Sequence, residues 1–424
     1  MSDALIHRLA AQLSFATEQV RHLDANAGYW PDSGHATIRL RDKVATEGAM
    51  LLLLARRAEA ACPELIPFND ALAAPLIREI RSPRLYDLIL RQPHVAATLG
   101  AGSVFLSAAG HSDPAFDLLI EDTLDAGFGN SVERVPYRQL DQLWTRNLLA
   151  AAPRPLDAVL AGSILHSRAH PFFMIEADAY AVTHAILYAT DFGHSAPPRS
   201  LDRARLADMV REGIAWTLVS EDFDLLIEYL MCAACLGGGE DGGDSPAARL
   251  GWHVVDRIWT QLGFLPGPTF DPARFRALSG PAADAYACEQ MYHTNFVAGM
   301  YCAMRLSLPA APAIPTAHPD GSGGATIERL LATGLAIAGT RMRPESPWFR
   351  ALDTAPLDDA ALAAILWDAV AIEAVRHGDR AIMERLARDA APSPGRTPRE
   401  LRWLLDRLDG AARSAPAATM ARAA

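Results

Sequence analysis

Acidic, phenolic, hydroxyl and imidazole side chains recur along one face of the segment 170–193. With about 100° between successive residues of a helix, one side gathers the polar groups. These are Glu176, Tyr180, Thr183, His184 and Asp191, together with Leu187. The opposite side carries Ile175, Ala179, Val182, Ala185, Ile186 and Ala189. A helix with a small apolar back and a polar front is typical of the wall of a cavity or of a buried polar network.

Three further segments present polar groups on one helical face. Glu289 and His293 are one turn apart, as are Asp224 and Glu228. Ser163, His166 and His170 are aligned in the same way along an expected helix over 155–169 and the residue that follows it. Side chains four residues apart on a helix lie about 6 Å from each other, so each pair can act on one ion or one substrate atom.

These residue types suit a divalent metal ion. Glu176 and His184 are eight residues apart in the chain. On a helix this spacing corresponds to about 12 Å along the axis, so one straight helix cannot supply both ligands. We therefore expect a site built between helices, with His184, Glu289 and His293 as metal ligands and Glu228 or Asp224 as a fourth group. Two imidazoles and one or two carboxylates suit Fe(II), Zn(II) or Mn(II). Glu228, Asp224 and Tyr180 are the candidate catalytic residues.

Less specific interpretations stay open. A buried histidine in a helix is often a hydrogen-bonded core residue without catalytic work. Cys232 and Cys235 form a C-x-x-C inside a helical pattern with no second pair. This setting favours buried small side chains over a zinc or redox site. A G-x-S-x-G motif, a P-loop and a dinucleotide-binding fingerprint are all absent from the sequence.

Composition limits the class of protein. Of 424 residues, 50% are hydrophobic and 21% are charged, as in ordinary globular proteins. The net charge of −11 argues against a nucleic-acid or anionic membrane surface. Five cysteines without a disulfide-like spacing favour the cytoplasm. The N-terminus lacks the pattern of a signal peptide, and no apolar run of about 18 residues predicts a membrane span. The oligomeric state is left open.

Helical periodicity runs through nearly every segment, and the alternation typical of strands is almost absent, so we predict an all-α fold. We expect helices at 2–24, 36–61, 69–91, 113–124, 135–150, 155–169, 172–190, 201–219, 222–236, 246–262, 284–306, 326–342, 357–376, 377–390 and 398–412. The expected organisation is N-terminal helical hairpins (1–150), a motif-bearing core (151–307), a Pro/Gly-rich connection (308–325), C-terminal helices (326–412) and a disordered tail (413–424).

Two motifs carry a resemblance to a known family. Tyr-x-x-Thr-His at 180–184, followed by Tyr-x-Thr-Asp-Phe-Gly at 188–193, is similar to the signature of an actinobacterial domain family of unknown function. Asp224-Leu225 with Glu228, and His293-Thr294, resemble later landmarks of that family. The resemblance covers about 155–305. It implies a helical domain of specialised metabolism and supplies no reaction.

Helical hairpins in series, with a buried polar helix among them, predict an (α/α) toroid with a central cavity. A plain multi-helix bundle is the alternative. The pattern is similar to the toroids of lanthionine cyclases and terpenoid cyclases, although the Cys-His dipeptide of the lanthionine cyclases' zinc motif is absent.

The leading hypothesis is a metal-dependent enzyme with a small-molecule or modified-peptide substrate. A second hypothesis is a metal-free acid-catalysed cyclase or lyase, with Asp222 or Asp224 as the acid and Tyr180, Tyr188 and Phe296 shaping an apolar pocket. A third is a non-catalytic binding scaffold.

Overall fold

The computed structural model describes residues 2–23, 40–128, 132–150, 152–237, 244–308, 324–389 and 395–414. These residues form helices and turns and contain no strand, which confirms the all-α prediction. The connection expected at 308–325 and the tail expected from 413 lie almost entirely outside the described residues. No helix in the described part of the chain combines the length and the apolarity needed to cross a membrane.

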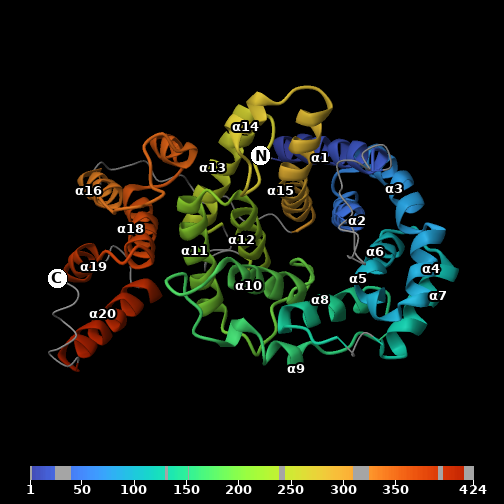
Figure 1. Cartoon of the computed structure of the whole chain (residues 1–424), viewed down its shortest axis with the longest axis horizontal. Helices are drawn as coiled ribbons and strands as arrows, with labels where there is room; N and C mark the ends of the chain where they lie inside the picture. The colour runs from blue at the N-terminus through green and yellow to red at the C-terminus, as the bar shows by residue number, and fades with distance from the viewer. Residues whose placement is uncertain are drawn as a thin grey trace.

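Six helices pack one against the next in a closed circuit (Figure 1). They are α2 (Leu40–Ala58), α6 (Ala101–Ala108), α8 (Pro136–Asn147), α10 (Glu176–Ala189), α12 (Phe223–Cys235) and α15 (Pro281–Ser307). The circuit closes where α15 packs against both α12 and α2, far apart in the sequence. It therefore draws on helices from both of the expected segments 1–150 and 151–307.

The remaining helices that precede Gly324 do not belong to the circuit, although α5 (Ala96–Leu99) also contributes residues to the cavity inside it. They are α1 (Ser2–Arg21), α3 (Ile66–Ile80), α4 (Pro83–Arg91), α5, α7 (Pro114–Asp125), α9 (Asp157–Leu160), α11 (Arg203–Ser220), α13 (Pro246–Leu262) and α14 (Pro272–Ala277). Among them, α1 and α3 back α2, while α11 and α13 back α12. An inner helix covered in this way is buried on several sides, which explains the almost continuous apolar sequence of α12.

The C-terminal helices do not enter the circuit (Figure 1). They are α16 (Gly324–Leu335), α17 (Pro347–Ala351), α18 (Asp359–Arg376), α19 (Arg380–Arg388) and α20 (Arg396–Ser414). Helix α18 packs against α11, α17 packs against α13, and α16, α19 and α20 pack around α18. Because they do not continue the series of hairpins around the cavity, the regular toroid stays a prediction.

Ionisable side chains, several of them buried, lie where these C-terminal helices meet the core. Glu212 of α11 is fully buried, and its Oε2 lies 3.0 Å from Arg396 Nη2. Arg211 forms an ion pair with Asp368 of α18. His170 Nε2 lies 3.7 Å from Glu212 Oε1. His170, which we aligned with candidate site residues, is therefore part of this structural cluster.

Asp191 joins three helices of the circuit. Its Oδ1 accepts hydrogen bonds from Trp144 Nε1 of α8 at 2.7 Å and from Arg57 Nη2 of α2 at 3.0 Å. Asp191 and Phe192 have φ angles of 46° and 52°. These angles lie in the left-handed region that non-glycine residues rarely adopt. The turn directs Phe192 to the cavity wall and ends α10.

Several helix predictions need correction. The helix expected over 69–91 is divided into α3 and α4 after Ile80, and the helix expected over 326–342 ends at Leu335. The helix expected over 155–169 is wrong, because Ser163 is extended (ψ 161°) and only α9 and a 3₁₀ turn at Ile164–His166 form. The helix expected from 172 begins at Glu176, where the Asp178 carboxylate accepts a hydrogen bond from the Ile175 N–H at 3.0 Å. The helix α6 was missed, although it belongs to the circuit.

Candidate metal centre and cavity

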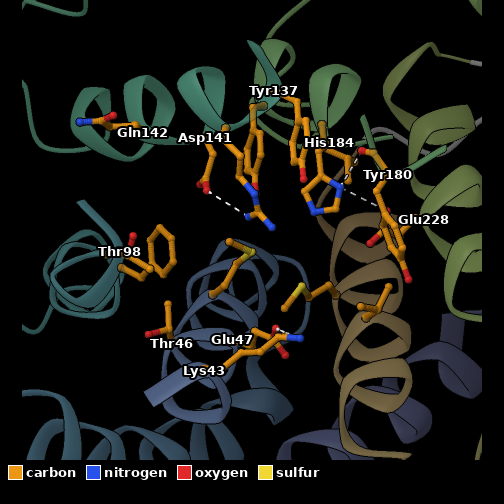
Figure 2. A pocket seen from close by; sticks show the side chains of 18 of the residues that line it. Lys43, Thr46, Glu47, Thr98, Tyr137, Asp141, Gln142, Tyr180, His184 and Glu228 are labelled. Carbon is orange, nitrogen blue, oxygen red and sulfur yellow. Dashed lines mark hydrogen bonds and ion pairs between the residues drawn. The ribbon is translucent and has the colours of Figure 1, made fainter. Parts of the chain in front are cut away.

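The circuit of helices surrounds a cavity of about 720 Å³. This size is typical of small-molecule sites. Charged and polar lining residues include Lys43, Thr46, Glu47, Thr98, Arg134, Tyr137, Arg138, Asp141, Gln142, Tyr180, His184, Glu228 and His293. Figure 2 shows Tyr137 and His184 on one side of the cavity and Lys43 and Glu47 on the opposite side. The polar residues of several separate helices therefore face one space.

Asp224, Glu228 and His293 form the candidate metal centre. Each offers one ligand atom, and these three atoms lie within 4.8 Å of one another. Asp224 and Glu228 come from successive turns of α12, and His293 comes from α15, which packs beside α12. Two carboxylates and an imidazole at this spacing can hold one divalent ion while leaving positions for water or substrate.

Glu47 of α2 fixes the orientation of the His293 ring. Its Oε2 lies 2.8 Å from His293 Nδ1, and Nε2 on the other side of the ring lies 3.4 Å from Asp224 Oδ2. A metal-bound histidine usually donates its second ring N–H to a carboxylate, which sets the tautomer. Glu47 occupies that position, because a proton on Nδ1 leaves Nε2 as the ligand atom.

In the absence of a metal, charges within this group compensate each other. Burial opposes the charged form of His293, but the carboxylates of Asp224 and Glu47 outweigh it and raise its pKa well above the usual value. Burial would raise the pKa of Asp224 and of Glu47, yet the His293 charge lowers both. Burial and the Asp224 charge raise the pKa of Glu228 to about 8.

Two hydroxyl groups from α10 support the carboxylates. Tyr180 OH donates to Asp224 Oδ2 at 2.8 Å, and Thr183 Oγ1 donates to Glu228 Oε2. Asp224 Oδ1 is buried and has no hydrogen-bond partner within the described protein. A buried carboxylate oxygen without a partner is costly, and a cation would satisfy it.

His184 lies beside this group without being one of its three members. Its Nδ1 is 2.9 Å from the Tyr180 carbonyl oxygen and 3.5 Å from Glu228 Oε2. Donation from Nδ1 to the carbonyl leaves Nε2 with a lone pair. Burial and the charge of Arg138 lower the pKa of His184 to about 4, so the ring is neutral near pH 7 and can accept a proton or bind a metal.

Glu289 does not belong to the site. It is exposed on α15 and does not line the cavity. His293 is the first residue of α15 to line the cavity, and Glu289 lies one turn before it. Spacing along the helix placed the two residues on one side but could not locate the end of the cavity. Among the predicted ligands, His184 and His293 line the cavity.

The candidate catalytic residues lie together. Glu228 and Tyr180 line the cavity. Asp224 is not among the lining residues, but its carboxylate contacts both Tyr180 and His293, which are. Glu228 is buried, as the apolar sequence around it predicted. Asp222, considered above as an acid, instead caps α12 by accepting from the Leu225 N–H at 3.1 Å.

Phe296 and the two cysteines of the C-x-x-C motif lie in the core. Phe296 is fully buried and does not line the cavity, whereas Tyr188 does. Cys232 and Cys235 are buried free thiols, as expected, and burial raises the pKa of Cys235 to about 12. A thiol in this environment is unreactive near neutral pH.

Sequence reasoning missed the contributions of α2 and α8. Glu47 lies 246 residues from His293 in the chain, so no local pattern connects them. Arg138 and Asp141 line the cavity from the first turns of α8. The signal available was the polar face of each helix, with Lys43 and Glu47 one turn apart beside an apolar run.

A family model for a domain of unknown function, DUF6895, matches residues 9–303, and the chain belongs to this family. The match contains all six helices of the circuit except the last turn of α15, and ends before the C-terminal helices. Neither a curated protein nor a solved structure matches the chain.

Proposed function

We propose that this protein is a divalent-metal-dependent enzyme that acts on a small molecule, or on a short modified part of a peptide, inside the cavity. The observation that carries the proposal is the Glu47–His293 contact at 2.8 Å, next to the ligand atoms of Asp224, Glu228 and His293. In protein metal sites, a ligand histidine usually binds the metal through one ring nitrogen and donates its other ring N–H to a carboxylate. Here Glu47 is that carboxylate, and the other nitrogen of His293 faces Asp224 and Glu228.

The metal would act as a Lewis acid toward a substrate oxygen or would activate a bound water. Asp224, Glu228 and His293 would hold it, Glu47 would orient His293, and His184 with its free Nε2 would serve as a base or a further ligand. Imidazole and carboxylate ligands suit iron, zinc and manganese, so iron-dependent oxidation and hydrolytic or lyase chemistry both remain candidates. A role in specialised metabolism stays a prediction from the family resemblance.

Metal content tests the proposal. Full-length protein, purified without a metal-affinity column and dialysed against Fe(II), Zn(II) or Mn(II), should retain about one ion per chain. His293→Ala and Asp224→Asn should lower this content at least tenfold. Glu289→Gln, one turn away on the same helix, is the matched control and should bind like the wild type. Circular dichroism would establish that each variant is folded.

Wild-type protein that retains no ion under any of these conditions would contradict the proposal. A specific observation then favours metal-free acid catalysis. With a pKa of about 8, Glu228 carries a proton at neutral pH and can donate it to a substrate in the cavity. In that case Glu228→Gln should abolish turnover although no metal is present.

A further inference from the structure

The cavity contains a second group of charged residues on the side formed by α8. Arg134, Arg138 and Asp141 line this side, and Arg138 lies in the first turn of the helix. The Arg138 side chain is 54% exposed, and Nη1 is 3.8 Å from Asp141 Oδ2. This separation is long for a hydrogen bond, so the planar guanidinium retains donors that can be directed into the cavity.

The surroundings of Arg138 add to its capacity for an anion. Its guanidinium carbon lies 5.0 Å from the centroid of the Tyr137 ring, which restricts the plane of the guanidinium group. Across the cavity, Lys43 is 52% exposed and 3.6 Å from Glu47. The cations are thus half exposed, whereas Asp224, Glu228 and Glu47 are already engaged by His293 and the hydroxyls of α10.

The lining of the cavity is also rich in methionine. Met50 of α2, Met231 of α12 and Met300 of α15 line it. Unbranched thioether side chains adapt to ligands of irregular shape and favour apolar groups. A ligand that satisfies both features has an anionic group and an apolar body.

We propose that the cavity binds an amphipathic organic anion, whose carboxylate or phosphate is held by the Arg138 guanidinium and whose apolar body lies against Met50, Met231 and Met300. This inference rests on the proposed function, because it names the substrate class of the same cavity. Arginine binds carboxylate and phosphate oxygens through two parallel N–H···O bonds, which lysine cannot reproduce.

The position of Arg138 relates the anion to the candidate metal centre. The Tyr137 ring, over which the Arg138 guanidinium lies, has its centroid 5.6 Å from that of the His184 ring, and His184 Nδ1 lies 3.5 Å from Glu228 Oε2. An anion bound by Arg138 therefore lies on the His184 side of the cavity. The body of the ligand then has room to extend toward His184 and Glu228.

Binding of defined probes tests the proposal. Octanoate and octyl phosphate carry the two candidate anionic groups on one alkyl chain, and octanamide is their neutral counterpart. Isothermal titration calorimetry on the full chain should give at least tenfold tighter binding for one of the anions than for the amide. The preferred anion distinguishes a carboxylate from a phosphate substrate. Arg138→Gln should remove this preference, and Arg138→Lys should restore only part of it.

Arg78→Gln, which changes an exposed arginine of α3 outside the cavity, should bind like the wild type. Equal affinity for anion and amide, no saturable binding of either anion at millimolar concentration, or an unchanged preference in Arg138→Gln would overturn the proposal. Metal content is measured separately. If Arg138→Gln retains its metal ion but loses the preference for the anion, the result supports both the metal-dependent function and the anion site. If the wild type prefers the anion but binds no metal, the result supports the anion site alone.

Discussion

His293 and Glu47 lie 246 residues apart in the chain, yet their side chains meet at 2.8 Å. If Glu47 orients His293 for a metal, Glu47→Ala should weaken metal affinity about 10- to 100-fold. Glu47→Gln should lose less, because its amide oxygen still accepts from Nδ1–H. Titration with Zn(II) in competition with a chromophoric chelator would measure both affinities, with Glu289→Ala as the control. Equal affinities for Glu47→Ala and the wild type would remove Glu47 from the site.

The Asp191 contacts should matter for stability. Asp191→Ala removes the acceptor of Trp144 Nε1 and Arg57 Nη2. We therefore expect a loss of about 2–3 kcal/mol in the free energy of unfolding. Asp191→Asn should cost less than about 1 kcal/mol, because asparagine keeps one oxygen acceptor and tolerates a positive φ. Urea unfolding monitored by circular dichroism gives both values. Similar losses in the two variants would contradict the role assigned to the carboxylate oxygen.

Close packing between α11 and α12 predicts a strong effect of one methyl group. A Cβ added at Gly213 would lie 2.3 Å from atoms of the Tyr229 ring. Gly213→Ala should therefore lower the free energy of unfolding by about 1–3 kcal/mol. Gly410→Ala is the matched control, because a Cβ there meets nothing within 4 Å in helix α20. For this control we expect a gain of about 0.5–1 kcal/mol. Thermal denaturation should separate the two variants in opposite directions.

Glu212 should make stability depend on pH. Burial outweighs Arg396 and Arg211 and raises its pKa from 4.5 to about 7. A raised folded-state pKa gives stability that is present below pH 4.5 and lost as the pH rises to about 7. Glu212→Gln lacks this loss, so its stability relative to the wild type should increase by about 3 kcal/mol over that interval.

Urea unfolding at several pH values measures this difference. His170 also faces Glu212, and burial together with Arg396 and Arg211 lowers the pKa of His170 to about 3. Because both the wild type and Glu212→Gln contain His170, the difference between the two proteins reports on Glu212. Glu328→Gln, the same change at an exposed position, should show a flat difference. A flat difference for Glu212→Gln as well would contradict the assigned shift.

Local pattern was sufficient to predict most of the helices and the inward face of α10 and α12. Tyr180, His184 and Glu228 line the cavity. Their position on the inward face was predictable, because helical periodicity alone determines which residues of a helix share a face. The same rule failed for Glu289, since the length of the cavity along α15 depends on neighbouring helices rather than on α15.

Contacts between distant segments could not be predicted. Glu47 and Arg138 reach the cavity from helices whose positions depend on packing around the whole circuit. Helix α6 was missed because its residues, Ala101–Ala108, are few and almost uniformly apolar, so they carry no amphipathic signal. His170 looked like a site residue, but a partner in α11, Glu212, determines its environment.

The closed circuit also has a consequence for the order of folding. Helix α2 ends at Ala58 and α15 begins only at Pro281, so their contact closes a very long loop. Closing a loop of this kind carries a large entropic cost. Asp224, Glu228 and His293 lie on α12 and α15, and Glu47 of α2 reaches His293 only when this contact is made. An ion held by Asp224, Glu228 and His293 would bind more tightly when Glu47 orients His293, so part of its binding free energy would stabilise the contact between α2 and α15. A higher metal concentration would then increase the fraction of chains in which α2 and α15 are joined.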